Sequence, residues 1–268
     1  MDDRSSLDPR QQADFDRFMR RVLNKCGIDL SQYREAQMHR RLWAMVERCG
    51  LRTFDEYFGL LDRDAGAWAA FLDRITINVS ELFRNPDRWR ELRDSVLPGL
   101  CPDRRPLRVW SAGCSYGAEP FTLAMILDEM APGVRHRITA TDIDERILAK
   151  AREGRFTDAD VRHVPAEARG RYLEPRGGLY TVAPSLRQRV DFRRHNLLAD
   201  PFPSGLDLIV CRNVIIYFTE NAKAALYRRF RAALRPGGVL FVGGTERVVN
   251  HREIGLNATL PFFYVRVQ

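Results

Sequence analysis

Two acidic residues, Glu119 and Asp142, follow apolar runs at places where a protein commonly binds a small molecule. Glu119 lies just beyond a turn that carries Gly113 and Gly117, and an amphipathic helical pattern begins there. Glycines in such a turn let the backbone approach a ligand and leave free amides at the start of a helix. Asp142 ends the next apolar run, about 20 residues further on, where a carboxylate can accept hydrogen bonds from both ribose hydroxyls. The spacing therefore predicts a site for a ligand that contains a nucleoside.

The residues of the turn also indicate which nucleoside is bound. A P-loop for ATP or GTP has a lysine directly after its last glycine, and the chain has no such pattern. A dinucleotide-binding turn has a third glycine where the pyrophosphate approaches, whereas this turn has Glu119. A carboxylate repels phosphate and attracts a cation. S-adenosylmethionine is phosphate-free and carries a sulfonium and an amino group, so Glu119 favours this methyl donor.

Apolar runs and helical patterns alternate along the last two thirds of the chain, and these elements must position both acids. The expected elements, in chain order, are strand 107–112, helix 119–130, strand 137–141, helix 145–153, strand 190–193, strand 206–211, helix 220–234, strand 239–242 and strand 262–267. This order predicts a parallel sheet with right-handed crossovers, which binds ligands at the carboxyl ends of its strands. Residues 155–188 interrupt the alternation, and Gly177-Gly178 predicts a small inserted hairpin.

The N-terminal third shows helical spacing only. A first apolar helix face ends at Gly27, and residues 53–56 have the pattern of a capping box. Asn85 followed by a proline is typical of a helix start, and three further prolines then indicate a linker. The predicted domains are therefore a helical domain over 1–97, which includes a linker helix, and an α/β domain over 98–268.

Composition limits the partners that are expected. The net charge is +8, and the basic excess gathers in residues 17–48 and 146–194, which favours an acidic protein surface over a nucleic-acid track. The five cysteines form no C-x-x-C pair, so we expect neither a metal site nor disulfides, and a reducing cytoplasm fits best. No apolar run approaches the ~20 residues of a membrane span, so no membrane insertion is expected.

Six short motifs occur in order along the chain, in residues 76–84, 110–120, 141–144, 196–198, 211–218 and 240–246. Together they resemble the chemotaxis receptor methyltransferases (CheR), which methylate protein glutamates with S-adenosylmethionine. The resemblance covers nearly the whole chain. It implies an N-terminal all-α domain followed by an α/β, Rossmann-like class I methyltransferase sheet with a small inserted β-subdomain. The chain departs from the pattern at Tyr116 and Ala118, where relatives often show Thr and Glu, and at 244–246, where a Ser-Glu ending is more usual.

The resemblance also implies a set of site residues. Asp142 is expected on the ribose, Asn196 and Leu197 beside the adenine, and Asn213 and Val214 beside the methionyl part and the sulfonium. The full set of expected cofactor-binding residues is Asn78, Ser80, Arg84, Gly113, Glu119, Asp142, Asn196, Leu197, Asn213 and Val214.

Methyl transfer to a carboxylate depends on alignment more than on acid–base catalysis. A glutamate with a pKa of ~4.3 is already ionised at neutral pH, so it needs no general base. The site must instead hold the nucleophile ~3–3.5 Å from the methyl carbon and remove its water. We expect Arg84 to orient the acceptor carboxylate and Tyr217 to donate a hydrogen bond, as the two catalytic residues.

The expected acceptor is a glutamate on the cytoplasmic helices of chemoreceptors, with S-adenosylhomocysteine as the second product. Arg34, Arg41 and Arg48 recur every seven residues and form a stripe that could attract such an acidic helical bundle. We expect a cytoplasmic monomer that has no nucleic-acid partner.

Two alternatives stay open at this point. A nucleic-acid methyltransferase would explain the basic charge, although an amino-methylating one usually has two prolines after the fourth strand and residues 213–216 have none. A non-catalytic module could keep the cofactor pocket as a sensor, although the presence of Arg84 and Tyr217 argues against it.

Overall fold

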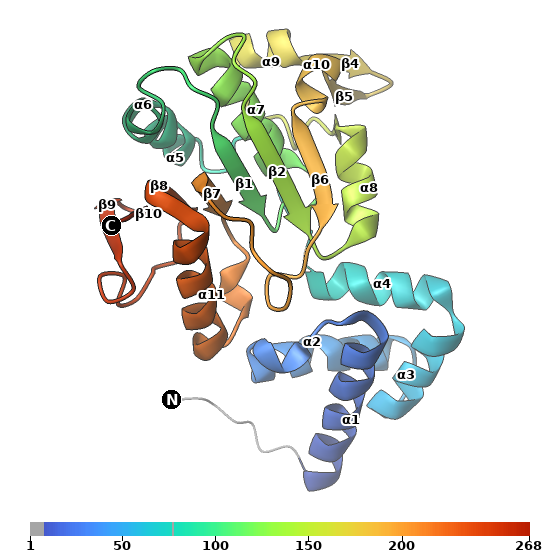
Figure 1. The fold of residues 1–268 in the computed structure, drawn as a ribbon. Coiled ribbons are helices and arrows are strands. Elements are labelled where there is room, and N and C mark those ends of the chain that lie inside the picture. Colours follow the sequence, from blue (N-terminus) through green and yellow to red (C-terminus); the bar gives the residue numbers. More distant parts are fainter. Residues whose placement is uncertain (1–7, 77) are drawn as a thin grey trace. The chain divides into compact units, whose positions relative to one another are not determined.

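A computed structural model describes residues 8–76 and 78–268, which form two compact units (Figure 1). One unit comprises the described residues up to Thr76 together with Tyr217–Lys223, and the other comprises Asn78–Ile216 and Ala224–Gln268. Residues 1–7 of the predicted helical domain and Ile77 of the first motif lie outside the described residues.

The first unit is helical, as expected. Its helices are α1 (Pro9–Cys26), α2 (Glu35–Arg48), α3 (Phe54–Arg63) and α4 (Ala65–Thr76). Gly27 ends α1 in the left-handed conformation at φ 75°, where its N–H reaches the carbonyl of Leu23. Phe18 is buried at the centre, with ring centroids of α3 and α4 aromatic residues 5.2–6.0 Å from its own. Aromatic burial therefore holds these short helices together.

Residues Tyr217–Lys223 return to this helical unit from far along the chain. The backbone N–H of Arg34 donates to the carbonyl of Tyr217 at 3.0 Å, and Thr219 donates to Gln32 at 2.8 Å. Phe218 packs edge-on against Tyr33, with ring centroids 4.9 Å apart. Local sequence patterns did not predict this return.

The second unit is built on a seven-stranded sheet with the order β6-β2-β1-β7-β8-β10-β9 (Figure 1). Its strands are β1 (Arg108–Ala112), β2 (Arg137–Asp142), β6 (Val190–Arg194), β7 (Leu206–Cys211), β8 (Leu234–Val242), β9 (Leu256–Leu260) and β10 (Phe263–Arg266). The first five run parallel, as predicted, and β10 and β9 are added antiparallel. Strand β9 was not predicted, and β8 begins five residues before the predicted strand at Val239. The strand order reverses at β1, which places a ligand site at its carboxyl end.

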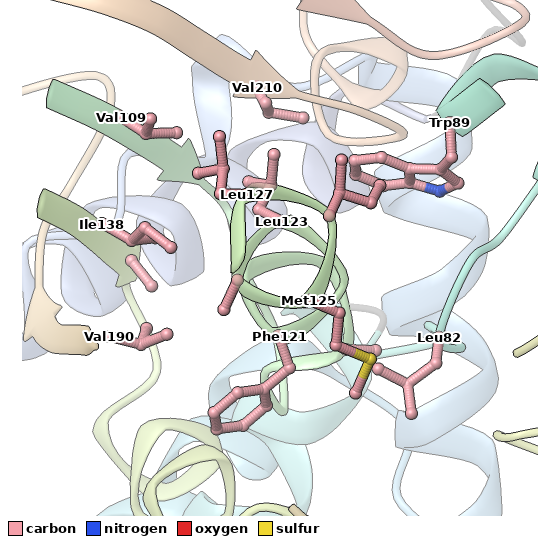
Figure 2. Packing of buried hydrophobic residues seen from close by; sticks show 14 of the residues in the cluster. Leu82, Trp89, Val109, Phe121, Leu123, Met125, Leu127, Ile138, Val190 and Val210 are labelled. Carbon is pink, nitrogen blue, oxygen red and sulfur yellow. The ribbon is translucent and has the colours of Figure 1, made fainter. Parts of the chain in front are cut away.

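Helix α7 (Ala118–Met130) is the centre of the core of this unit. Its side chains from Ala118 to Asp128 are all buried, as in a helix that packs on every side. Figure 2 shows Leu123 and Leu127 directed towards Val109 and Val210 of the sheet. The other crossover helices are α8 (Glu145–Glu153) and α11 (Glu220–Ala233).

The segment before the sheet also belongs to this unit. It forms α5 (Pro86–Glu91), a π-helical turn (Leu92–Val96) and α6 (Leu97–Leu100). Trp89 is 2% exposed and lies in the same core as α7 (Figure 2). The predicted boundary at 97/98 therefore differs from the division of the structure at residue 77, because this apolar helix face packs on the α/β core.

The inserted β-subdomain consists of β3 (Arg155–Phe156), α9 (Ala166–Tyr172), β4 (Leu173–Arg176), β5 (Leu179–Val182) and α10 (Pro184–Arg187). The strands pair in the order β3-β5-β4. Gly177 and Gly178, both at positive φ, connect β4 and β5 as the predicted hairpin turn.

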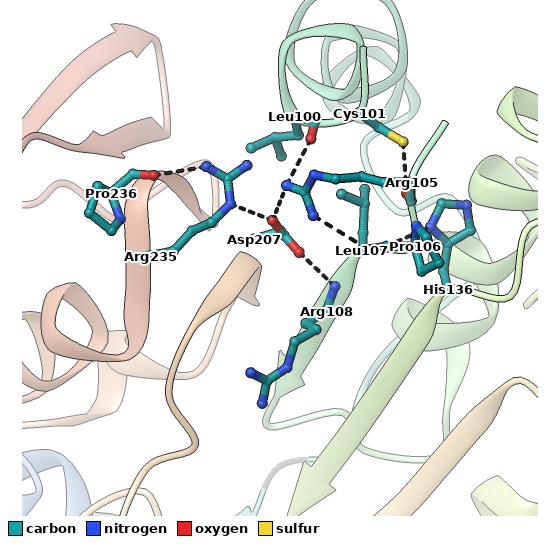
Figure 3. A network of polar contacts seen from close by, with 10 residues as sticks. All are labelled: Leu100, Cys101, Arg105, Pro106, Leu107, Arg108, His136, Asp207, Arg235 and Pro236. Atoms are coloured by element: carbon teal, nitrogen blue, oxygen red, sulfur yellow. Dashed lines mark hydrogen bonds and ion pairs between the residues drawn. The ribbon is translucent and has the colours of Figure 1, made fainter. Parts of the chain in front are cut away.

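A polar network closes the amino ends of the parallel strands (Figure 3). Asp207, 2% exposed, accepts hydrogen bonds from the side chains of Arg105 and Arg235 and from the backbone of Arg108. Burial alone would raise the pKa of Asp207, but these hydrogen bonds bring it below its ordinary value. His136 is also buried here, and its Nδ1 accepts the backbone N–H of Leu107 at 3.2 Å.

Over the residues that the structure describes, no helix combines the length and apolar character that crossing a membrane requires.

Candidate functional site

The glycine turn after β1 has the close approach that its sequence indicates. Gly113 has φ 80°, and its N–H donates to the carbonyl of Thr141 at the end of β2 at 2.8 Å. A Cβ atom at Gly113 would lie 2.5 Å from a methyl carbon of Val214, so only glycine lets these two segments meet. Gly117, at φ 93°, precedes the first residue of α7. The turn therefore exposes the start of a buried helix at the carboxyl end of β1.

Asp142 is buried beside this turn, at 9% exposure. Its carboxylate accepts the backbone N–H groups of Ser115 at 2.9 Å and Asp144 at 3.1 Å. Burial raises its pKa to about 6, although these hydrogen bonds lower it. Asp144 caps α8 through the backbone amides of Arg146 and Ile147, so Asp142 is not the cap. Its position suits a carboxylate that accepts hydroxyl groups of a ligand.

Glu119 lies in the first turn of α7 and is also buried, at 9% exposure. The neutral hydroxyl of Ser111 donates to Oε1 at 2.7 Å. Burial raises the pKa of Glu119 to about 7, and the charge of Arg212 offsets only part of this rise. A ligand cation beside Glu119 would favour its ionised form. The two carboxylates thus fit a nucleoside ligand that carries positive charge and no phosphate.

The loop after β7 is shaped by Glu246, whose role sequence reasoning missed. This buried carboxylate accepts four backbone N–H groups, from Asn213 (2.9 Å), Val214 (3.2 Å), Ile215 (2.9 Å) and Gly243 (2.6 Å). Asn213 takes φ 60°, a conformation that needs such outside support. The only signal in the sequence was that Glu246 comes shortly after two glycines, Gly243 and Gly244, which end an apolar run.

The segment 78–84, here called the strap, lies against the same end of the sheet. Asn78 donates to Asp144 at 3.3 Å and accepts the hydroxyl hydrogen bond of Ser115 at 3.1 Å. Ser80 and Arg84 follow on the strap, and the Arg84 guanidinium donates to the carbonyl of Val79 at 3.1 Å. The strap therefore meets both the glycine turn and the α8 cap.

Arg212 was also missed, and it holds the end of the strap. Its guanidinium donates to the carbonyl of Arg84 and to Oδ1 of Asn85, both at 3.0 Å. It also lies 5.0 Å from the ring centroid of Trp89 and 4.9 Å from that of Phe241. Asn85, expected to cap α5, makes no side-chain cap hydrogen bond and instead binds Arg212. A buried arginine with this many partners fixes the backbone from which Arg84 projects.

Asn196 and Leu197 follow β6, next to the end of β2. His195 donates its backbone N–H to the carbonyl of Asp142 at 2.9 Å, which ties this loop to β2. Asn196 accepts the N–H of Leu198 at 2.9 Å, and Arg229 donates to the Leu197 carbonyl at 2.6 Å. Both residues are buried beside the predicted ribose acid.

The α/β unit brings together most of the predicted site. The residues that it places at the carboxyl ends of its strands or on the strap are Asn78, Ser80, Arg84, Gly113, Glu119, Asp142, Asn196, Leu197, Asn213 and Val214. Tyr217 belongs to the helical unit, where the Arg41 guanidinium lies 5.6 Å from its ring centroid. Among the described residues, no group of three or more His, Cys, Asp or Glu side chains could hold a metal ion.

Comparisons with known proteins agree on one family. Residues 78–259 match the CheR methyltransferase SAM binding domain, and residues 13–76 match the CheR methyltransferase all-alpha domain. A chemotaxis protein methyltransferase of Listeria monocytogenes is 42% identical over 260 residues, covering 96% of this chain and 99% of that protein. One of Escherichia coli is 34% identical over 247 residues, covering 87% and 84%. The chain belongs to the CheR methyltransferase family, has the class I methyltransferase fold and uses S-adenosylmethionine as its cofactor.

Proposed function

We propose that this chain transfers a methyl group to glutamate side chains on the cytoplasmic helices of chemoreceptors, giving glutamyl methyl esters and S-adenosylhomocysteine. One observation carries the choice of a carboxylate acceptor: the Arg84 guanidinium projects from a fixed backbone and, among the described residues, has no carboxylate within 4 Å. The related proteins named chemotaxis protein methyltransferases support a role in chemotaxis.

Each proposed cofactor-binding residue has a role that follows from its chemical groups. When bound, S-adenosylmethionine supplies an electrophilic methyl group on a sulfonium. Glu119 would hold its positive amino group, because a nearby cation favours the ionised carboxylate. Asp142 would accept the ribose hydroxyls, and Asn196 and Leu197 would flank the adenine. Asn213 and Val214, fixed by Glu246, would lie beside the methionyl part.

The acceptor carboxylate needs orientation rather than deprotonation. A glutamate is ionised at neutral pH, and Arg84 would align it through charge-assisted hydrogen bonds. Pairing that is too strong would stabilise the nucleophile, so the role of Arg84 is to orient it. Tyr217 would donate a hydrogen bond through its hydroxyl group. Removal of water from the acceptor and alignment at ~3–3.5 Å would supply the rate enhancement.

The arginine stripe of α2 supports an acidic helical partner. Arg34 forms an exposed ion pair with Glu220 at 3.3 Å, Arg41 lies over the Tyr217 ring, and Arg48 is exposed. Such side chains raise the association rate with an acidic surface in a salt-dependent way. Reversal of all three charges should therefore slow receptor methylation most at low salt. Such a partner would place the protein in the cytoplasm, and we propose that it acts there as a monomer.

The direct test uses S-adenosylmethionine labelled in its methyl group. The protein is incubated with cytoplasmic receptor fragments from its host, and separately with host RNA and DNA. We expect label on receptor glutamates as a base-labile methyl ester. Label on nucleic acid would support a nucleic-acid methyltransferase instead, and cofactor binding without turnover on any of these would support a non-catalytic module.

A further inference from the structure

Tyr116, one of the two positions where the glycine turn departs from the family pattern, reaches out of the turn to the inserted β-subdomain. Its hydroxyl donates to Oδ1 of Asp160 at 3.0 Å. Its ring packs against Phe156 of β3, with centroids 6.0 Å apart. A single side chain thus joins the turn that holds Gly113 and Gly117 to the insertion.

Asp160 is itself held in a fixed position. Its Oδ2 accepts the backbone N–H and the hydroxyl of Thr157, at 2.8 and 2.7 Å. Its backbone carbonyl accepts the N–H of Leu82 on the strap at 3.0 Å. Asp160 therefore connects the turn that follows β3 with both Tyr116 and the strap.

The strap has one more attachment in the same place. Glu81 pairs with Arg162 of the insertion at 2.5 Å. Phe83, which follows, takes φ 54°, so the end of the strap needs outside support. Two consecutive strap residues, Glu81 and Leu82, are thus bound to the insertion.

The Tyr116 hydroxyl remains protonated in this setting. Burial raises its pKa above the ordinary value, and the charge and hydrogen bond of Asp160 raise it further, while the Ser80 backbone lowers it. The hydroxyl is therefore a lasting hydrogen-bond donor to Asp160 at neutral pH, rather than an acid or base in the reaction.

We propose that Tyr116 is a positioning residue that, through Asp160, fixes the strap and so holds Asn78, Ser80 and Arg84 in place for the cofactor and acceptor. A displacement of Asp160 in the inserted β-subdomain reaches the methyl-transfer site through this connection. The proposal rests on the proposed placement of the cofactor beside the strap.

The test is Tyr116→Phe in the full chain, which removes the hydroxyl and keeps the ring. Titration with S-adenosylhomocysteine should show a Kd about 3- to 10-fold higher, the loss expected for one hydrogen bond. Hydrogen exchange at the amide of Leu82 should become faster. Methyl transfer to any accepted substrate should show a higher KM for S-adenosylmethionine.

Tyr172→Phe is the matched control. The Tyr172 hydroxyl of α9 donates to Asp128 of α7 at 2.8 Å, so the change breaks an equivalent tyrosine–aspartate bond in the same unit away from the strap. We expect it to lower thermal stability about as much as Tyr116→Phe while leaving the Kd and the strap exchange unchanged. If Tyr116→Phe does not fold, Asp160→Asn provides the same comparison.

Two results would overturn the inference. One is an unchanged Kd in Tyr116→Phe, whether or not strap exchange rises. The other is an equal rise in Kd in Tyr172→Phe, which would mean a general loss of stability. The titration uses no acceptor, so a failure to methylate receptor glutamates would count against the proposed function and leave this test intact.

Discussion

The two ends of the parallel strands both bury carboxylates, but they treat the negative charge in opposite ways. At the amino ends, Asp207 is surrounded by Arg105, Arg235 and a backbone amide, and its pKa is lowered. At the carboxyl ends, burial raises the pKa of Asp142 to about 6 and that of Glu119 to about 7. Buried carboxylates at the two ends therefore differ in their partners: arginines of the chain neutralise Asp207 at the amino end, whereas we propose that a bound ligand supplies the positive charge beside Glu119 at the carboxyl end.

The largest expected effect is on folding, at the amino end. Asp207→Ala should lower the free energy of unfolding by about 3 kcal/mol, the low end for a broken buried pair because both arginines reach water. Urea unfolding measures this loss, and the Kd for S-adenosylhomocysteine should not change. Asp191→Ala, which breaks the exposed pair with Arg193, is the control and should cost below about 1 kcal/mol. A cofactor affinity that fell together with stability would remove the distinction between the two ends.

Arg84→Ala tests the acceptor side of the carboxyl end. Turnover should fall about 100-fold because the nucleophile loses its alignment. The Kd for S-adenosylhomocysteine should stay within about threefold, since the strap backbone is held by Arg212 and Trp89 rather than by the Arg84 side chain. Arg90→Ala, at an exposed ion pair with Asp87, serves as the control. Normal turnover in Arg84→Ala would place acceptor orientation elsewhere.

Glu119→Gln removes the negative charge that we propose for ligand binding at the carboxyl end. We expect the Kd for S-adenosylhomocysteine to rise about 10- to 100-fold, the range for a hydrogen bond to a charged group. Stability should not fall, because the change relieves the burial of a carboxylate. Isothermal titration measures the Kd, and thermal unfolding measures the stability. Glu153→Gln, on the exposed end of α8, is the control. Lost stability without lost affinity would make Glu119 a structural residue.

The smallest effect is on pH dependence, and its sign differs between the two ends. The folded pKa of Glu119 is raised from 4.5 to about 7, so its contribution to stability falls as pH rises through that window. Cofactor affinity should rise about tenfold from pH 6 to 8 as Glu119 ionises. Asp207, with a lowered pKa, stabilises the fold above its ordinary value of 3.8 and loses this effect as pH falls through the folded pKa. A flat affinity profile in the unmodified protein, or an unaltered slope in Glu119→Gln, would contradict the assignment.

Features that depend on neighbouring residues could be predicted from the sequence. The Gly113 turn and the hairpin at Gly177-Gly178 are confirmed because each is set by backbone conformations within a few residues. The sequence also predicted that Glu119 and Asp142 lie at the same edge of the sheet, because the carboxyl ends of parallel strands are aligned.

Features that depend on distant residues could not be predicted in this way. Asn85 has the local pattern of a helix cap, but its side chain binds Arg212, which lies 127 residues later in the chain. Glu246 acts on amides more than thirty residues earlier, and nothing around it marks those partners. His136 stands between two arginines, and its Nδ1 meets the backbone N–H of Leu107 only where the start of β1 folds against it. In each case, one polar side chain meets a partner that only the folded chain supplies.

The return of Tyr217–Lys223 to the helical unit has a consequence for modularity. A cut at residue 77 would divide the sequence into two segments, but the helical unit also contains seven residues from much later in the chain, Tyr217–Lys223. A helical domain grafted from a relative would meet a foreign 217–223 segment, and the ring contact of Phe218 would depend on which residue the graft carries at position 33. Recombination within this family should therefore work best when the helical piece and the 217–223 segment come from the same parent.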